Sequence, residues 1–503
     1  MINNHQPVPL PDYSTGKVKL PSPEEIPNVD LEVINYHRPI FGTFHSKYMI
    51  VDRKIAIVQS NNIMDNDNFE MMTHLEGPIV DSFYDMALIS WHNVMKPPLP
   101  CLNTPAATAG YPTFEAKSHA AMFDQSGKLL PSNQRWVSSA QGCLHFYSCI
   151  DSTNPMPDGT NNLQDVAQQG AAKNLPEHTS KDEHYDVDIA SEVLRSVSVL
   201  NPRDGEIRIN AITRHLSEHS FLPHRFSPPL TTISPDTTIQ PDTKGTAPDI
   251  SPNETLTPLI PLPPHPPFPI AMVCRKPWGA PNHHCVYTPQ NEAFLSSLRH
   301  AHSSVFIQTP NLNAEPLFSE IIAACRRGVH VTYYYCLGYN DAGELLPFQN
   351  GNNEMFAHRL YNELPKEFHD NLDIYNYVAK DQIRPIHNKF KKRSCHIKLM
   401  VVDGHIGIQG NGNQDTQSYF HSQEINIMLD SELVCKAWMD GIMRNQNTHI
   451  YGKVLKEGPE AGCWVDPETG KQAEAAIGVD AGKFAWAKGI VGAVQRVRGL
   501  GGF

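Results

Sequence analysis

Apolar residues are concentrated in two regions of the chain, and in each region their spacing predicts strands and helices. In the first region, alternating or continuous apolar runs predict strands over 30–36, 44–52 and 54–60. Residues 83–91 follow with the spacing of a helix that packs by one face. The second region begins near residue 270, and there helices and strands alternate. This alternation predicts an α/β fold with mixed sheets flanked by helices.

The predicted elements of the second region are seven in number. The helices are EAFLSSLRHAH and PLFSEIIAACRRG, and the strands are SVFIQTP, VHVTYYYCLG, NLDIYNY, HIKLMVVD and HIGIQG. Each predicted helix stands between two strands or directly before one, which favours a largely parallel or mixed sheet.

The stretch between the two regions has a different composition. Residues 101–225 are mixed, with helix candidates IASEVLRSVSVL and EIRINAITRHLS. Residues 226–269 are dominated by Pro, Ser, Thr and Asp, which cannot form a packed core, so we expect a disordered linker. A spacer is the favoured role, and a partner that binds polyproline II helices is the alternative. The expected organisation is an irregular N-terminus (1–29), a first half (30–100), an insertion (101–225), the linker (226–269), a second half (270–450) and a C-terminal tail with a basic and aromatic segment (451–503).

The two ordered regions share one sequence pattern. The segments HSKYMIVD and HIKLMVVD both read HxKxxxxD. QSNN and GNGN follow them at the same distance, and EMMTHLEGPIV aligns further on with EINIMLDSELV. So many matched positions are far beyond chance, and the chain therefore contains two copies of one unit.

The His and Lys residues of the two copies are the candidate catalytic residues: His45, Lys47, His396 and Lys398. In an extended chain, residues two positions apart share a face. Two such sets facing each other would surround one tetrahedral phosphate with two imidazoles and two ammonium groups. One imidazole attacks phosphorus, the other protonates the departing alkoxide, and the lysines hold the oxygens on which charge develops. This chemistry requires neither metal nor cofactor, and we expect neither.

The turns after the two motifs supply further candidates. Asn62, Asn413 and Ser60 are expected to bind the phosphate oxygens, because amides and hydroxyls offer neutral hydrogen-bond donors. The alternative for both asparagines is that they shape the turns.

Each imidazole also needs a carboxylate on its far nitrogen, so that the correct tautomer faces the substrate. Glu70 and Glu424 are the candidates, with Glu76 as the alternative to Glu70. Asp52 and Asp403 stand at an odd offset from the histidines, on the opposite face of a strand, and are expected to be motif scaffold that organises the turns DRK and DGH.

These residues resemble the phospholipase D superfamily, whose members carry two HxKxxxxD motifs, each followed by a GSxN or GGxN turn. The resemblance covers about residues 30–96 and 271–450. It implies a pseudosymmetric α/β sandwich with the site between two halves. It further implies that His45 is the nucleophile and His396 the general acid. The resemblance indicates the pair of histidines more strongly than it indicates which of them has which role.

The first copy departs from the superfamily pattern in two ways. Gln59 stands where the superfamily has glycine. In addition, residues 290–395 place strands and helices before His396, whereas only residues 1–44 precede His45. We therefore expect the first half to be incomplete and the chain to be an N-terminally truncated product of a larger protein.

The net charge, the cysteine spacing and the length of the apolar runs limit which partners and which setting are expected for this chain. A formal net charge of −12 and a pI near 6.1 argue against a protein that coats nucleic acid, so no nucleic acid partner is expected. The ten cysteines lack the spacing of a disulfide framework, which indicates reduced thiols and a cytoplasmic setting. No apolar run is long enough to span a membrane, so contact with a membrane would be peripheral.

Two segments are rich in basic residues: one directly precedes the second motif, and the other, in the tail, also contains aromatic residues. RPIHNKFKKRSCHIK precedes the second motif and either attracts an anionic headgroup or is a solvated loop. GKFAWAKGIVGAVQRVRG, in the tail, docks on the protein itself or lies in a membrane interface.

The leading interpretation is a phospholipase D-type phosphodiesterase that hydrolyses or transphosphatidylates glycerophospholipids through a phosphohistidine intermediate. Its partners would be a phospholipid substrate and a peripheral membrane surface. One alternative is a nuclease or another phosphodiesterase of the same superfamily. The other is an inactive, truncated protein that binds lipid or a protein partner.

Overall fold

The structure is a computed structural model, and it describes residues 44–51, 53–62, 68–91, 260, 262, 265–266, 268–275, 288–346, 349–390, 393–480 and 482. Several sequence expectations lie outside these residues: the strand over 30–36, the insertion 101–225, most of the linker 226–269, Asp52 and the tail beyond residue 482.

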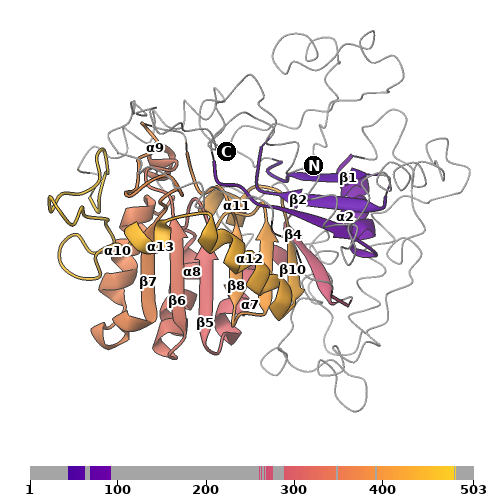
Figure 1. Cartoon of the computed structure of the whole chain (residues 1–503), viewed down its shortest axis with the longest axis horizontal. Coiled ribbons are helices and arrows are strands. Elements are labelled where there is room, and N and C mark those ends of the chain that lie inside the picture. The colour runs from indigo at the N-terminus through magenta and orange to yellow at the C-terminus, as the bar shows by residue number, and fades with distance from the viewer. Residues whose placement is uncertain are drawn as a thin grey trace, which may run out of the picture.

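A seven-stranded mixed sheet forms the larger part of the described fold (Figure 1). Its strands, in spatial order, are β4 (Ile270–Arg275), β10 (Glu424–Asp430), β9 (Ile406–Gly410), β8 (Leu399–Val402), β5 (Ser304–Gln308), β6 (His330–Tyr335) and β7 (Leu372–Asn376). The strands β5, β6 and β7 are parallel to one another, and all other neighbours are antiparallel. The predicted mixed α/β fold is confirmed.

Helices flank this sheet. They are α7 (Pro289–His300), α8 (Glu315–Arg326), α9 (Asp341–Glu344), α10 (Asn353–Glu363), α11 (Thr416–Phe420), α12 (Glu432–Arg444) and α13 (Thr448–Tyr451), with a 3-10 helix over Lys366–Asn371. The helix α7 begins where the Thr288 side chain accepts a hydrogen bond from the backbone N–H of Asn291, with Pro289 in its first turn. None of the helices in the described ranges has the length and apolarity that a membrane span requires.

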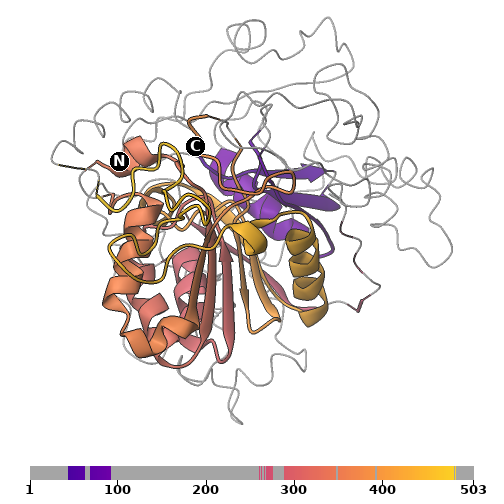
Figure 2. The same ribbon diagram turned by 60° about the vertical axis from the view of Figure 1, so that its left-hand side comes forward.

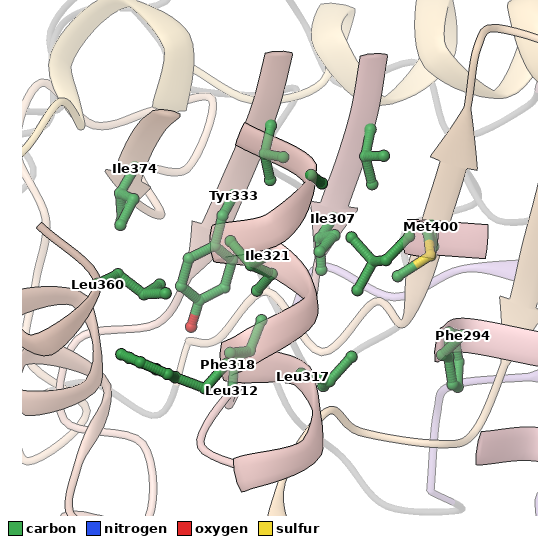
Figure 3. Packing of buried hydrophobic residues seen from close by; sticks show 14 of the residues in the cluster. Phe294, Ile307, Leu312, Leu317, Phe318, Ile321, Tyr333, Leu360, Ile374 and Met400 are labelled. Atoms are coloured by element: carbon green, nitrogen blue, oxygen red, sulfur yellow. The ribbon is translucent and has the colours of Figure 1, made fainter. Parts of the chain in front are cut away.

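One face of the sheet packs against α7, α8 and α10. Figure 3 shows this core, in which Phe294 of α7 and Leu317 of α8 lie over Ile307 of β5 and Met400 of β8. All four side chains are buried. At ~1.5–3 kcal/mol for each large apolar side chain removed from water, burial of this kind is the main source of stability for the sheet and fixes its position beneath the site.

The first region forms a three-stranded antiparallel sheet with one helix. Its elements are β1 (Tyr48–Val51), β2 (Ile55–Gln59), β3 (Met72–Glu76) and α2 (Ile79–Trp91). This order repeats that of β8, β9, β10 and α12, as the sequence repeat predicts. A complete pseudosymmetric pair of halves stays a prediction, because β1 has no strand on its outer edge in the described residues, whereas β8 is paired there with β5.

The two sheets share a second hydrophobic core, and the small sheet, indigo in Figures 1 and 2, lies beside the β4 and β10 edge of the large one. Val58 of β2 and Phe83 of α2 belong to this core together with Leu399 of β8, Ile427 of β10 and Trp438 of α12. The apolar faces of the two copies of the repeat are thus buried in one cluster. This packing holds the segments that precede β1 and β8 next to each other.

Candidate active site

The two motif histidines lie just before β1 and β8, and each is tied by its backbone to the other copy of the repeat. The N–H of His45 donates to the carbonyl of Gln423 at 3.1 Å, and the N–H of His396 donates to the carbonyl of Phe69 at 2.8 Å. Gln423 and Phe69 directly precede the two candidate glutamates. The sequence predicts that the strands start at the motifs themselves, but the backbone here pairs between the sheets instead of within one ladder.

The imidazoles are paired crosswise with the glutamates. Nδ1 of His45 lies 2.8 Å from Oε1 of Glu424, and Nδ1 of His396 lies 2.9 Å from Oε1 of Glu70. The sequence indicated these carboxylates but not which one serves which imidazole. The Nε2 atom of each ring is left without a hydrogen-bond partner among the described residues. In this arrangement each carboxylate fixes Nδ1 as the protonated nitrogen, so Nε2 carries a lone pair that is available for chemistry.

Glu76, the alternative to Glu70, lies elsewhere. Its Oε1 atom is 3.3 Å from Nε2 of His74, another residue of β3. Because Glu76 is engaged with His74 rather than with a motif imidazole, the geometry favours Glu70.

Two serine hydroxyls orient the glutamates. Oγ of Ser60 donates to Glu70 at 2.6 Å, and Oγ of Ser418 donates to Glu424 at 2.6 Å. We expected Ser60 among the phosphate ligands, but its single hydroxyl hydrogen is directed to the carboxylate. Ser418 is a site residue that the sequence repeat does not reveal. It comes from α11, in the longer segment between the second turn and Glu424, and has no counterpart at that place in the first copy.

Asn411 occupies the position in the second copy that Ser60 occupies in the first. Its amide Nδ2 donates to the carbonyls of Lys47 at 3.0 Å and Gln59 at 2.6 Å. This side chain therefore links the second turn to the first motif. The serine that the second turn lacks is replaced in function by Ser418.

The motif lysines are buried beside the imidazoles. Nζ of Lys398 donates to the carbonyl of His396 at 2.6 Å, and Nζ of Lys47 donates to the carbonyl of His45. Burial lowers the pKa of Lys47 to about 7 and the pKa of Lys398 to about 8, and the Lys398 ammonium further lowers the pKa of Lys47. These amines are thus close to losing their charge near neutral pH, and an anion placed between them would restore it.

The imidazoles and glutamates respond to the same environment. Burial and the nearby lysines lower the pKa of His45 well below its ordinary value and that of His396 to about 3. Burial also raises the pKa of Glu424 to about 8. For Glu70 burial acts in the same direction, but the hydrogen bond and charge of His396 and the charge of Lys398 outweigh it and lower the pKa. The Coulombic influence of Lys398 on His45 and of Lys47 on His396 shows that both motifs lie in one electrostatic site.

The asparagines of the two turns, Asn62 and Asn413, differ from each other more than the two imidazole and glutamate pairs do. Asn413 is buried, its Nδ2 donates to Asp415 at 3.1 Å, and its Oδ1 has no partner within the described residues. Asn62 is half-buried at the end of the described stretch 53–62. Phosphate binding by these two residues stays a prediction.

Asp403 is a scaffold residue with a different partner from the one expected. Its carboxylate accepts hydrogen bonds from the backbone N–H groups of His302, Ser303 and Ser304 at 2.7–2.9 Å. We expected it to organise its own turn, but it instead anchors the chain where β5 begins. The equivalent Asp52 lies outside the described residues.

The basic segment before the second motif is partly neutralised. Arg393 forms an ion pair with Asp381 at 2.5 Å, and Arg384 lies 3.6 Å from Asp466. Lys391 and Lys392 lie outside the described residues. Within the described ranges, no group of three or more His, Cys, Asp and Glu side chains is arranged to hold a metal ion.

Two imidazole and lysine pairs, with carboxylates behind the imidazoles, define a site suited to phosphodiester chemistry. Comparison with known families agrees with this class: residues 294–444 match a family described as "Cardiolipin synthase, PLD-like domain". Residues 294–444 of this chain are thus similar to a PLD-like domain. The matched region contains the second motif, and the first motif lies outside it.

Solved structures that are similar to this chain include the following three. The phospholipase D family member Nuc from Salmonella typhimurium is 13% identical over 37% of this chain and 97% of that one, with a TM-score of 0.26. NucT from Helicobacter pylori is 15% identical over 36% and 98%, with a TM-score of 0.25. The phosphatidylserine synthase of Haemophilus influenzae Rd KW20 is 14% identical over 38% of this chain and only 41% of that one, with a TM-score of 0.29. No curated protein sequence matches the chain.

Proposed function

We propose that this chain cleaves phosphodiesters by a phospholipase D-type mechanism and that its substrates are glycerophospholipids. The observation that carries the proposal is the crossed pairing of His45 with Glu424 and of His396 with Glu70, which leaves two oriented Nε2 atoms in one lysine-rich site. An ordinary pair of strand residues needs no such arrangement, because neither buried carboxylate nor buried ammonium is required for packing.

In the proposed reaction, Nε2 of His45 attacks phosphorus and the bond from phosphorus to the headgroup oxygen breaks. The imidazolium of His396 gives its Nε2 proton to the departing alkoxide. Water or an alcohol then attacks the phosphohistidine, with His396 as base, and frees His45. Lys47 and Lys398 stabilise the charge that develops on the non-bridging oxygens.

Substrate charge is part of this mechanism. In the free protein the pKa of His396 is about 3, so little of its imidazole is protonated at neutral pH. A bound phosphodiester carries a negative charge that favours both the imidazolium and the two ammonium groups. The substrate thereby assists in charging the acid that cleaves it.

A lipid substrate is favoured over a nucleic acid by the net charge of −12, which disfavours long-range attraction of a polyanion. The test measures choline release from phosphatidylcholine vesicles and cleavage of single-stranded DNA by the purified chain, with a chelator present. We expect choline release that persists with chelator and is abolished by His45→Ala and by His396→Ala.

A matched control is His74→Ala, which removes a half-buried imidazole of β3 that is engaged with Glu76, outside the site. Its choline release should equal that of the unaltered chain. Cleavage of DNA without choline release would move the assignment to a nuclease. Vesicle binding without turnover of either substrate would show an inactive lipid-binding protein.

A further inference from the structure

A pair of cysteines lies directly behind the second motif. Cys336 directly follows β6, and Cys395 directly precedes His396. The two cysteines are 59 positions apart along the chain. Their Sγ atoms are 2.9 Å apart, with one thiol hydrogen-bonded to the other. Both side chains are buried, and both are free thiols in the structure. They share a small cluster with Tyr339, Tyr377 and Ala379, against which Phe69 packs.

We propose that Cys336 and Cys395 form a reversible disulfide that regulates the site, with a peroxide as the oxidant. The two sulfurs already face each other, so bond formation requires them to approach by roughly 0.9 Å, to the usual ~2.05 Å. The disulfide itself does not depend on the proposed function, whereas its effect on turnover does.

The two thiols are not equivalent, and the difference assigns their roles. The backbone N–H of Cys395 donates to Sγ of Cys336 at 3.0 Å, whereas Sγ of Cys395 donates to the carbonyl of Thr309 at 3.8 Å. Burial raises the pKa of the Cys395 thiol well above its ordinary value, so that thiol stays protonated. Cys336 is therefore the sulfur that attacks the peroxide, and Cys395 is the one that resolves the product.

The electrons and atoms balance in two steps. The Cys336 thiolate attacks hydrogen peroxide, the O–O bond breaks, and a sulfenic acid and hydroxide form. The Cys395 sulfur then attacks the sulfenic sulfur, its proton leaves with the departing oxygen as water, and the S–S bond forms. In total two thiols are oxidised to a disulfide and one peroxide is reduced to two waters. A small dithiol reverses the change by exchange.

Cys395 is coupled to the site through the backbone. Its neighbours on both sides pair with Phe69, since the N–H of Phe69 donates to the carbonyl of Ser394 at 2.7 Å and the N–H of His396 donates to the carbonyl of Phe69 at 2.8 Å. Phe69 precedes Glu70, the carboxylate that orients His396. A displacement of Cys395 toward Cys336 therefore moves His396 relative to Glu70. Misplacement of a reacting group by ~1 Å can reduce the rate by about 10²-fold.

The first measurement is chemical and needs no substrate. The full chain is treated with hydrogen peroxide under native conditions, unreacted thiols are alkylated in denaturant, and the digest is analysed by mass spectrometry. We expect a disulfide-linked peptide pair that contains Cys336 and Cys395 and that disappears after dithiothreitol. Absence of this pair, or a linkage confined to other cysteines, overturns the proposal even if the chain proves to be an active phosphodiesterase.

The second measurement is turnover of bis(4-nitrophenyl) phosphate before and after peroxide. We expect a loss of about tenfold or more, recovered with dithiothreitol. Cys336→Ala should lose both the linked peptide and the sensitivity to peroxide. The matched control is Cys435→Ala, because Cys435 is also a fully buried thiol but lies in the core between the two sheets; this variant should respond as the unaltered chain does. If the linked peptide forms and turnover does not change, the coupling of the disulfide to His396 is refuted. If Cys336→Ala fails to fold, the peptide map of the unaltered chain still decides whether the disulfide forms.

Discussion

Replacement of Glu424 by Gln tests the crossed arrangement most directly. Oε1 of Glu424 lies 2.8 Å from Nδ1 of His45 and accepts the Ser418 hydroxyl hydrogen at 2.6 Å. A glutamine in the same rotamer keeps a carbonyl oxygen at this place, so both hydrogen bonds can persist. Burial raises the pKa of Glu424 to about 8, so the carboxyl is largely neutral at pH 7 in the free protein and gains its charge when the His45 ring becomes cationic. The substitution therefore removes the group that can carry a negative charge behind the imidazole during the reaction.

The expected effect follows from the charge that His45 gains during the reaction. When Nε2 attacks phosphorus the ring becomes cationic, and a hydrogen bond to a charged partner is worth ~1.5–3 kcal/mol. At ~1.36 kcal/mol for each factor of ten in rate, loss of this stabilisation lowers kcat/KM by about 10- to 150-fold. Glu70→Gln removes the corresponding charge behind His396 and should cause a loss of the same order.

The assay is choline release from phosphatidylcholine vesicles at pH 7, with unfolding midpoints measured to show that the variants remain folded. Glu76→Gln is the matched control, because this carboxylate stands at the end of β3 beside His74 and not beside a motif imidazole. A Glu424→Gln variant that keeps kcat/KM within twofold, in a chain that His45→Ala inactivates, would refute the idea that the crossed carboxylates support catalysis.

Three further outcomes follow from the structure. The pKa values of Lys47 and Lys398 are about 7 and about 8, so the positive charge on these amines increases as the pH falls. Sulfate should therefore bind the free site more tightly at pH 6 than at pH 9. A calorimetric titration in which sulfate affinity does not depend on pH would contradict this expectation. Phe83→Ala leaves a cavity in the core between the two sheets and should lower the free energy of unfolding by ~3–5 kcal/mol in denaturant titrations, whereas Met49→Ala, at a side chain that is 51% exposed, should change it little. Asp403→Ala leaves the N–H groups at the start of β5 without their acceptor and should lower the free energy of unfolding by ~1 kcal/mol. Those N–H donors lower the pKa of Asp403, so the stability that Asp403 contributes is present above the ordinary carboxyl pKa and should disappear as the pH falls through the lowered pKa. A contribution of Asp403 to the free energy of unfolding that does not change with pH would count against the anchoring role.

Much of the fold could be predicted from periodicity. The expected strand over 54–60 contains β2, and HIKLMVVD contains β8. The helix expected over 83–91 begins four residues earlier, at Ile79, because the preceding residues continue the apolar face. The helix α12 escaped prediction even though its apolar residues are spaced as in α2, the helix at the same place in the first copy. The same comparison of the two copies would have found it.

The sequence by itself predicted which residues would carry the chemistry. The repeated HxKxxxxD pattern and the glutamates that follow are visible in one dimension, because a duplicated unit preserves spacing along the chain. The residue types alone, imidazole with ammonium, indicated phosphate chemistry.

Only the tertiary structure decided which residues lie together. The pairing of His45 with Glu424 joins positions that are 379 residues apart, and no local rule of propensity or periodicity relates them. The contribution of Ser418 and the contact between Cys336 and Cys395 depend in the same way on how the two sheets pack. Packing brings distant backbones within hydrogen-bond distance, and a hydrogen bond forms according to distance and direction in space, whatever the separation along the chain.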